Sequence, residues 1–557
     1  MDRIKIVMLG GQDEMFKNMV AIEINDDIFV VEAGFKLPDK TKPGIDYIIP
    51  RYDYLIENKS KVKAYFLTHG YDSVFGALPY IYDKVPATIY CSEPTFYSLK
   101  GFCQHNKIDF TKLSVSTVKP SDDVLINNRL ISLFGVTSNF AESFGISFST
   151  DQGNIIYIGN AVIHNDQEPG FVFDRQKINN ICTKKTLVLL CDSAYADRDG
   201  YCSPNYRLLH GLGTDIFDSQ GRLFLAIDRP NLFNIVECLN AAIANGRKII
   251  PYDDKAIEVI DALTKVGVIH PNRDTLMPLE EVNRLRPQDV LVFMTGFGKK
   301  FLDSIALLAT RNNDEKYVFL TKDDTFVFGA HFLQEFDIAT TATIDELYRN
   351  DCRIIRPAKG RYLRMHACKE DLKLFISLFN PRYLVPISAD FVKLLACAKV
   401  ALNMNIGLNH NNVFIVDNGN VLEFEAGIGR ISSQKVVAGD IFVDGKGIDD
   451  TGAKVLEERN TLADEGIIIL GITISKEKHQ IIAGPDVQAR GLIFLKDNEV
   501  LIREITRLFT MTVEGELAKE NYSIAYMETT IKDLVFKAIR RALNKTPTII
   551  PIIIEIK

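Results

Sequence analysis

Short apolar runs of strand length, separated by polar turns, dominate the N-terminal third of the chain. Six of these runs predict buried strands, at residues 4–9, 20–24, 28–31, 64–68, 155–158 and 187–190. The polar residues Asn25, Asp26 and Asp27 separate the second run from the third, and this composition favours a hairpin turn. This part of the chain is therefore predicted to build β-layers.

The middle of the chain alternates predicted strands with helical patterns. The strands are predicted at 222–226, 248–251, 290–295 and 317–321. A helix is predicted over 231–245, where apolar residues recur at helical spacing. This alternation is typical of a parallel sheet with crossover helices.

Residues 441–557 show a third pattern. Apolar residues recur at helical spacing from Met527 to Ala542, and Thr546 and Pro547 then stop the helix. An isoleucine-rich run over 548–556 predicts a terminal strand. We therefore expect an α+β unit at this end of the sequence.

The stretch from Ala64 to Tyr80, AYFLTHGYDSVFGALPY, places polar groups directly after a buried strand. The predicted strand delivers His69 and Gly70 into a turn. Apolar residues such as Val74 and Leu78 then follow at the spacing of one helix. Ligands gather at the carboxyl ends of strands in α/β sheets, so His69 is a candidate metal ligand.

This stretch resembles the signature loop T-H-G-H-x-D-H-x-G-A-L-P of the ribonuclease J branch of the β-CASP nucleases, within the metallo-β-lactamase superfamily. The residues that match it are Thr68, His69, Gly70, Gly76, Ala77, Leu78 and Pro79. The resemblance implies that three metal ligands of the family, His, Asp and His, are replaced here by Tyr71, Ser73 and Val74. The loop pattern is retained and its metal donors are not.

The resemblance extends along the rest of the chain. It implies that Asn160 replaces an aspartate that bridges two metals, and that Asp192 matches the aspartate of the first β-CASP motif. His366 stands at the position of a later motif histidine. Ser138 and Ser388 replace two further metal ligands of the family.

The fold class implied by this resemblance is α/β: a metallo-β-lactamase αββα sandwich with an inserted β-CASP α/β domain and a C-terminal α+β domain. The two parts of the metallo-β-lactamase-like domain are expected at 1–205 and 353–440. The β-CASP-like domain is expected at 206–352 and the C-terminal association domain at 441–557. Residues 295–301, TGFGKKF, keep part of the phosphate-gripping T-G-S-Q-G-E-P motif of the family.

Too few ligands remain for the two zinc or manganese ions that the family uses. A pair of divalent ions needs roughly six or seven ligands, and the histidines and cysteines here include no H-x-H, H-x-x-x-H or C-x-x-C spacing. We expect no metal cofactor and no intact catalytic set, with His69, Asp192 and His366 as its remnants. The alternative for each remnant is structural: His69 as a hydrogen-bonded residue at a strand end, and Asp192 as an acceptor of backbone N–H groups.

The densest basic run of the chain lies just before His366. Its members are Arg353, Arg356, Lys359, Arg361 and Arg364. If the family fold holds, part of this run faces the cleft, where cations could bind an RNA backbone without cutting it. The candidate RNA-binding residues are Arg356, Lys359, Arg361 and Arg364. The alternative is a solvated strand edge that is protected by charge.

Composition and charge indicate the compartment of the protein and the kinds of surface that it can bind. A net charge of −7 and a pI near 5.8 argue against a surface coated with cations for non-specific nucleic-acid binding. The nine cysteines lack paired spacing, which favours reduced thiols in the cytoplasm over a disulfide framework. The apolar runs are too short for a signal peptide or a membrane span, so no membrane association is expected.

The resemblance implies a ribonuclease J-like protein of RNA processing and decay. We expect a non-catalytic or weakly catalytic RNA-binding partner of an active ribonuclease J paralogue, in a homo- or hetero-oligomer that assembles through the C-terminal domain. One alternative is an active, metal-dependent 5′–3′ exo- and endoribonuclease with a site rebuilt from His69, Asp72, Asp192 and His366. Another is a structural oligomer that binds no RNA.

Overall fold

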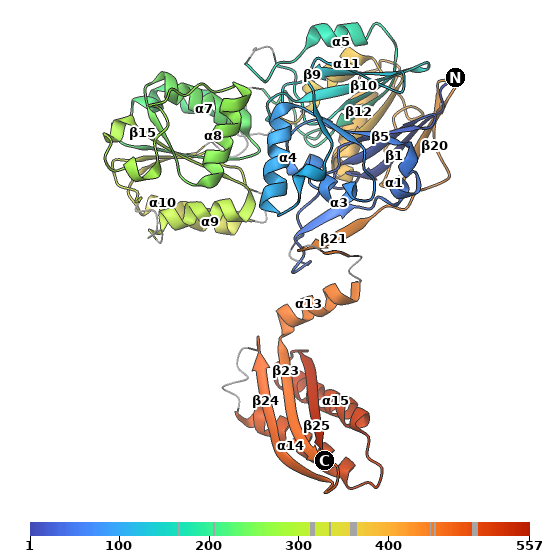
Figure 1. The fold of residues 1–557 in the computed structure, drawn as a ribbon, viewed down its shortest axis with the longest axis vertical. Coiled ribbons are helices and arrows are strands. Elements are labelled where there is room, and N and C mark those ends of the chain that lie inside the picture. Colours follow the sequence, from blue (N-terminus) through green and yellow to red (C-terminus); the bar gives the residue numbers. More distant parts are fainter. Residues whose placement is uncertain are drawn as a thin grey trace. The chain divides into compact units, whose positions relative to one another are not determined.

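The computed structural model describes residues 1–39, 41–164, 168–203, 207–311, 318–332, 336–356, 365–445, 447–449, 453–492 and 499–557. The chain forms two compact units (Figure 1). The larger comprises residues 1–36 and 49–440, and the smaller comprises residues 37–48 and 441–557. The remnants His69, Asp192 and His366 all lie in the larger unit.

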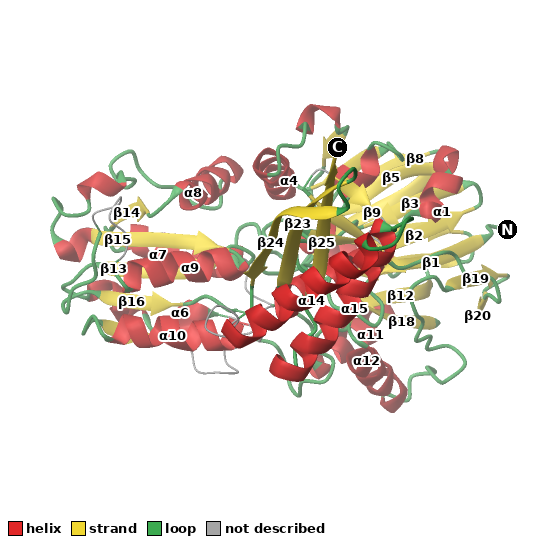
Figure 2. Ribbon diagram, turned by 90° about the horizontal axis from the view of Figure 1, so that it is seen from below, coloured by secondary structure: helices red, strands yellow, loops and turns green. Residues whose placement is uncertain are grey.

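Two β-sheets form the first part of the larger unit (Figure 2). The eight-stranded sheet has the order β20 (Ile428–Ile431), β19 (Val421–Glu425), β1 (Ile4–Gly10), β2 (Met19–Ile24), β3 (Asp27–Val31), β5 (Val62–Leu67), β6 (Thr88–Cys91) and β7 (Val115–Thr117). The six-stranded sheet has the order β18 (Tyr383–Ile387), β12 (Thr186–Asp192), β11 (Gly153–Ile158), β10 (Phe144–Thr150), β9 (Arg129–Gly135) and β8 (Asp123–Ile126). The six strands predicted in the N-terminal third are confirmed.

The two sheets pack face to face around one apolar core. Ile6 and Phe66 of the first sheet and Phe148 of the second are among its fully buried members. Helices α5 (Arg175–Ile181), α11 (Lys369–Phe379) and α12 (Phe391–Asn403) cover the outer face of the six-stranded sheet. Helix α1 (Asp53–Glu57) lies on the outer face of the other sheet, where Tyr54 donates a hydrogen bond to Glu23 of β2. The layers therefore follow the order helix, sheet, sheet, helix.

The strands that carry the candidate residues run in the same direction within each sheet. Strand β5 pairs in parallel with β3 and β6, and β12 pairs in parallel with β11 and β18. Parallel neighbours present their carboxyl ends at the same edge of a sheet, which is where ligands bind in open α/β sheets.

The segment after β5 differs from the single helix that its apolar spacing predicts. It forms two short helices, α2 (Asp72–Phe75) and α3 (Leu78–Tyr82), and the longer α4 (Glu93–His105) follows. The Ala77 N–H donates to the carbonyl of Ala33 at 2.8 Å, and the Ala33 N–H donates to the carbonyl of Val74 at 2.6 Å. These bonds to the chain after β3 take the place of helical ones, so the helix breaks at Gly76.

A parallel sheet with helices on both sides forms the middle of the chain (Figure 1). Its order is β14 (Lys248–Pro251), β15 (Val290–Gly296), β13 (Leu223–Asp228), β16 (Thr325–Phe328) and β17 (Arg353–Ile355). Helices α7 (Leu232–Ala244) and α8 (Asp254–Val266) lie on one side, and α9 (Gly298–Ala309) and α10 (Asp337–Tyr348) lie on the other. The parallel sheet and the helix predicted over 231–245 are confirmed.

The strand predicted over 317–321 is wrong. Residue 317 lies outside the described residues, and residues 318–321 adopt no regular structure. Val318 and Leu320 are buried in the core of this sheet, which explains the apolar alternation. The Asp324 carboxylate accepts hydrogen bonds from the Thr321 N–H and hydroxyl, so the chain turns there and the strand begins only at Thr325.

The smaller unit is built on a sheet of order β24 (Gln480–Arg490), β23 (Ile467–Ser475) and β25 (Thr548–Ile556). Helices α14 (Glu499–Leu517) and α15 (Ile524–Leu543) pack on one face of this sheet. The helix and the terminal strand predicted there are confirmed. The unit also contains α13 (Ala453–Glu465). None of the helices that the structure describes has the length and apolar content of a segment that crosses a bilayer.

Candidate functional site

Five strand ends bring buried polar side chains together. Glu32 follows β3, His69 follows β5, Asn160 follows β11, Asp192 ends β12 and Ser388 follows β18. Each of these residues is at most 8% exposed. The first two belong to the eight-stranded sheet and the other three to the six-stranded sheet. The site therefore lies where the carboxyl ends of strands from both sheets meet.

Glu32, Thr68 and His69 form a chain of hydrogen bonds. The Thr68 hydroxyl donates to Oε1 of Glu32 at 2.7 Å, and Nδ1 of His69 lies 2.8 Å from the same hydroxyl oxygen. Since the hydroxyl gives its only hydrogen to Glu32, His69 donates through Nδ1. Burial raises the pKa of the Glu32 carboxyl to about 7, although the bond from Thr68 favours the charged form. Glu32 therefore changes its charge close to neutral pH.

The His69 imidazole is neutral in this site. Burial, and then the charge of His366, lower the pKa of His69 to about 3. The Tyr71 ring meets the imidazole edge-on, with 4.7 Å between ring centroids. With Nδ1 protonated, Nε2 of His69 can accept a hydrogen bond. The structural alternative for His69, a hydrogen-bonded residue at a strand end, describes these contacts.

His366 connects Asp192 to Asn160. Its Nδ1 lies 2.6 Å from Oδ2 of Asp192, and its Nε2 lies 3.3 Å from the side-chain nitrogen of Asn160. The Asn160 amide donates to Nε2, and Nδ1–H donates to the carboxylate. The His366 side chain is 16% exposed, whereas Asp192 is buried. The structure thus brings together all three remnants that the sequence identified.

A buried asparagine network that the sequence did not reveal positions the segment before His366. The Met365 N–H donates to Oδ1 of Asn139 at 2.5 Å, and the Asn139 amide donates to Oδ1 of Asn231 at 2.9 Å. The Asn234 amide donates to the same oxygen at 2.8 Å. No spacing rule identifies these residues, because they come from three distant parts of the chain.

Aromatic packing fills the space beside Tyr71, which stands at the position of a family metal ligand. Its ring contacts Phe140 edge-on, with 5.9 Å between centroids. The Phe140 ring also lies only 2.2 Å from where a Cβ on Gly70 would stand, so it covers the loop closely. Val74, which also stands at a ligand position of the family, is 1% exposed. These positions now belong to the apolar packing of the loop.

The three serines that replace family metal ligands take part in local structure. The Ser73 carbonyl oxygen lies 1.5 Å from the ideal Cβ position on Gly34, so only glycine fits there. The Ser138 hydroxyl lies 2.9 Å from that of Ser143 and accepts the Phe140 N–H at 3.0 Å. Ser388 has a left-handed backbone with φ of 63°. The Ser138 hydroxyl and the Ser73 carbonyl thus take part in the local packing and hydrogen bonding of the chain.

Comparison with known proteins places this site in a family. The family model "Ribonuclease J, beta-CASP domain" matches residues 220–347, and the model "Ribonuclease J C-terminal domain" matches residues 454–556. Proteins named Ribonuclease J 2 from Staphylococcus aureus and Staphylococcus epidermidis are 29% and 28% identical over 553 residues, which is 99% of this chain and 98% of each relative. The chain belongs to the ribonuclease J family.

The fold class expected from the resemblance is confirmed as a metallo-β-lactamase sandwich with a β-CASP domain and a C-terminal α+β domain. A crystal structure of a protein of unknown function from Enterococcus faecalis V583 shares this fold, with a TM-score of 0.51 and 14% identity. The match covers 76% of this chain and 100% of that one. The domain boundaries expected from the sequence stay a prediction.

The side chains of this ribonuclease J family site do not fit the metal pair of the family. At the seven ligand positions only His69 is a strong donor, and its Nδ1 is directed to Thr68. Across the described ranges, no three His, Cys, Asp or Glu side chains are grouped so that they could hold a metal ion. Asn160 and Ser388 offer neutral oxygens, which are weak ligands for zinc.

The alternative of a site rebuilt from His69, Asp72, Asp192 and His366 stays a prediction. Asp72 begins α2. Burial raises the pKa of its carboxyl, and the charges of Arg229 and His105 act against that shift.

The candidate RNA-binding run is described only in part. Arg353 begins β17, and Arg353 and Arg356 are both exposed. Lys359, Arg361 and Arg364 lie outside the described residues. In the phosphate-gripping segment, the Thr295 hydroxyl is buried and donates to the Ile227 carbonyl at 2.8 Å. That hydroxyl therefore supports the sheet and is not directed to a ligand.

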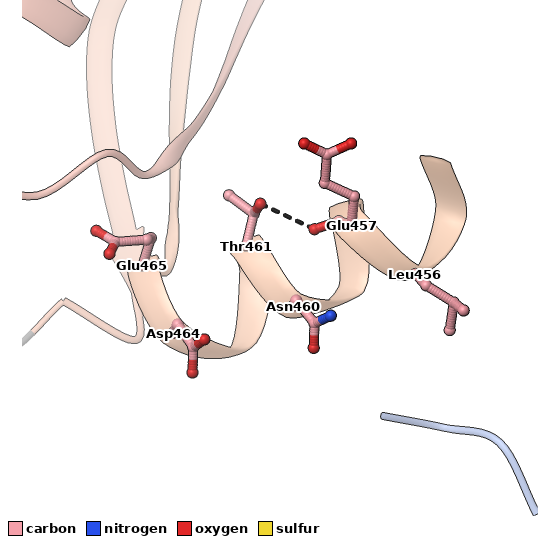
Figure 3. Close-up of a pocket in the computed structure, with 6 residues that line it drawn as sticks. All are labelled: Leu456, Glu457, Asn460, Thr461, Asp464 and Glu465. Carbon is pink, nitrogen blue, oxygen red and sulfur yellow. Dashed lines mark hydrogen bonds between the residues drawn. The ribbon is translucent and has the colours of Figure 1, made fainter. Parts of the chain in front are cut away.

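An open pocket lies on helix α13 in the smaller unit (Figure 3). Its lining consists of Leu456, Glu457, Asn460, Thr461, Asp464 and Glu465. The Thr461 hydroxyl donates to the Glu457 carbonyl at 2.9 Å, and the labelled side chains do not converge on a common point. We assign no chemistry to this pocket.

Proposed function

We propose that this member of the ribonuclease J family is a non-catalytic or weakly catalytic RNA-binding protein. It would act in RNA processing and decay in the cytoplasm, beside an active ribonuclease J. Membership of the family supports the RNA-processing part of this proposal. The replacement of most metal ligands supports the part of the proposal that says catalysis is weak or absent.

One observation carries the proposal: the centre of the site is occupied by groups that bond to each other. Glu32, Thr68 and His69 form one set, and Asp192, His366 and Asn160 form another. Such groups can accept or donate hydrogen bonds to a phosphate or a ribose hydroxyl. Their two carboxylates and two imidazoles are fewer than the roughly six or seven ligands needed to hold two ions that would activate water.

The exposed arginines support the RNA-binding part. Arg353 and Arg356 stand at the start of the basic run that ends next to His366. Phosphate contacts from arginine give affinity without sequence preference and need no catalyst. The overall charge of −7 makes such a local run the expected place for RNA, because most of the surface does not attract it.

Metal analysis and an RNA cleavage assay test the catalytic part on the purified full chain. We expect clearly less than one zinc or manganese ion per chain after incubation with each metal and desalting. A 5′-monophosphorylated RNA should show at most weak metal-dependent turnover compared with an active ribonuclease J as the positive control. A stoichiometric metal pair together with turnover that is lost in His366→Ala would overturn the proposal.

RNA affinity and its salt dependence test the binding part. Arg353→Glu combined with Arg356→Glu should weaken RNA binding, and the slope of log K against log salt should fall by about 1 for each phosphate that the variant no longer binds. The control is Arg284→Glu combined with Arg286→Glu, since both of these side chains are 74% exposed at a separate place. Equal affinity and slope in the two double variants would contradict RNA binding by this run.

A further inference from the structure

Two buried cysteines meet where the chain leaves the two-sheet sandwich and returns to it. Cys202 lies in the loop after β12, and Cys368 lies just before α11, two residues after His366. The five strands of the parallel sheet all fall between these cysteines in the sequence. The side chains are 0% and 1% exposed. The pair therefore marks the neck of the inserted sheet.

A single carboxylate holds both backbones at this neck. The N–H groups of Cys202 and Cys368 donate to the same oxygen, Oδ2 of Asp371, at 2.8 and 3.0 Å. Their nitrogens lie no farther apart than the sum of these two distances. A disulfide requires Cα atoms about 4.4–6.8 Å apart, and this shared acceptor fits that requirement.

Further backbone bonds fix the loop against the start of α11. The Lys369 N–H donates to the Arg198 carbonyl, and the Glu370 N–H donates to the Gly200 carbonyl, both at 3.0 Å. The outer side of this loop is exposed over residues 197–201. Local opening of an exposed loop would give a small reagent access to the pair.

The two sulfurs interact directly. The Cys202 thiol donates a hydrogen bond to the Cys368 sulfur, and this bond lowers the pKa of the Cys368 thiol and raises that of Cys202. The Cys368 sulfur also accepts the Asp371 N–H as the N-cap of α11, an eleven-residue helix. Hydrogen bonds to sulfur and a helix N-terminus favour the thiolate, which is the form that attacks oxidants.

We propose that Cys202 and Cys368 form a modification site, in which a hydroperoxide oxidises them to a disulfide that closes the neck of the inserted sheet. The Cys368 thiolate attacks the peroxide, an S–O bond forms and the O–O bond breaks. The alkoxide or hydroxide that leaves takes up the proton that the Cys368 thiol released, and departs as an alcohol or water. The Cys202 sulfur then attacks the Cys368 sulfur, the S–O bond breaks and water leaves with the thiol proton. The two thiols supply the two electrons that reduce the peroxide.

The disulfide would restrain the segments that carry Asp192 and His366, although neither residue is part of the cross-link. The disulfide would tie the loop after Asp192 to the residue that follows the His366 segment, and it would close a loop that contains the entire parallel sheet. Such a cross-link prevents the chain segments at Cys202 and Cys368, where the chain leaves the sandwich and returns to it, from moving apart. This inference stands apart from the proposed RNA-binding function, because its first readout is chemical.

Peroxide treatment of the full chain, followed by alkylation and mass spectrometry, tests the proposal. We expect the loss of two hydrogens and a Cys202–Cys368 cross-linked peptide, formed about tenfold faster than any other cysteine product and reversed by dithiothreitol. In Cys202→Ser, which leaves the α11 N-cap in place, a sulfenic-acid reagent should label Cys368. Hydrogen exchange at the Lys369 and Glu370 amides should slow in the oxidised protein.

Another cysteine pair serves as the internal control. The thiols of Cys191 and Cys397 also interact, but burial raises the pKa of Cys191, and it raises that of Cys397 to about 12. This pair should stay reduced under the same treatment, and Cys238→Ser should react like the wild type. The proposal is overturned if no Cys202–Cys368 peptide forms, or if Cys191 and Cys397 are linked at the same rate.

Discussion

At the scale of single residues, burial decides what the remaining polar groups can do. His69, Asp192 and His366 could be identified from the sequence, because each stands at a motif position. The titration of Glu32 near neutral pH could not, since it depends on complete burial and on hydrogen bonds from distant segments. Chemistry that depends on burial is therefore read from the structure.

Glu32→Gln should remove a pH dependence of stability. The folded pKa of Glu32, about 7, lies above its ordinary value of 4.5, so the folded chain holds this proton more tightly than the unfolded chain. The associated stability is complete below pH 4.5 and is lost as the pH rises through 7. Urea unfolding should show the wild type losing about 3 kcal/mol relative to the variant between pH 5 and pH 8.

The exposed carboxylate Glu520 provides the control for this measurement. Glu520→Gln should leave the pH dependence of unfolding parallel to that of the wild type. Parallel curves for Glu32→Gln as well would show that the Glu32 carboxyl does not titrate in this range.

His366→Ala should lower the free energy of unfolding by about 1–3 kcal/mol. The substitution leaves the buried Asp192 carboxylate without its imidazole donor. Asp192→Ala combined with His366→Ala should cost less than the sum of the single changes, because the partners are removed together. Denaturant unfolding measures each value, with the exposed His410→Ala as the control. Additive losses would mean that the pair does not act as a unit.

At the scale of helices and strands, the order of elements could be predicted better than their ends. The predicted hairpin over 20–31 forms with the expected turn, since Asn25 adopts a left-handed backbone with φ of 59°. The strand predicted over 317–321 failed because burial of Val318 and Leu320 without strand pairing gives the same apolar alternation as a strand. The single helix after His69 failed because hydrogen bonds to Ala33 interrupt it.

Gly34→Ala tests the contact that shapes the loop after β5. A Cβ at this position would stand 1.5 Å from the Ser73 carbonyl oxygen, so α2 would have to move. We expect the free energy of unfolding to fall by about 3 kcal/mol or more. Gly515→Ala, in the last turn of α14 with nothing within 4 Å of its Cβ position, should instead raise it by up to about 1 kcal/mol. A neutral Gly34→Ala would refute the close contact.

At the scale of the whole molecule, the proposed association through the C-terminal unit has a candidate surface. On β25, Ile549 is buried in the core with the helices and Ile553 is partly buried there, whereas Ile550, Ile552, Ile554 and Ile556 are 39–53% exposed. Ile550 pairs in register with the half-buried Ile469 of β23, so the open face of the sheet is apolar across two strands. An apolar patch of this kind is typical of an interface.

Ile552→Lys combined with Ile554→Lys should disrupt self-association and binding to an active ribonuclease J. Two ammonium groups on this face would have to be desolvated when the interface forms. Analytical ultracentrifugation should show a smaller species, and mixing with the active paralogue should give no complex. Val500→Lys, at a position on α14 that is 78% exposed, is the matched control. Unchanged assembly in the double variant would exclude this face.

The ring of Phe140 limits how a metal could be introduced into this site. It lies over Gly70 and against Tyr71, which stands at a ligand position of the family pattern. Replacing Tyr71 alone with histidine would disturb this aromatic packing before enough donors were present to bind an ion. A metal-binding variant would therefore need several substitutions made together.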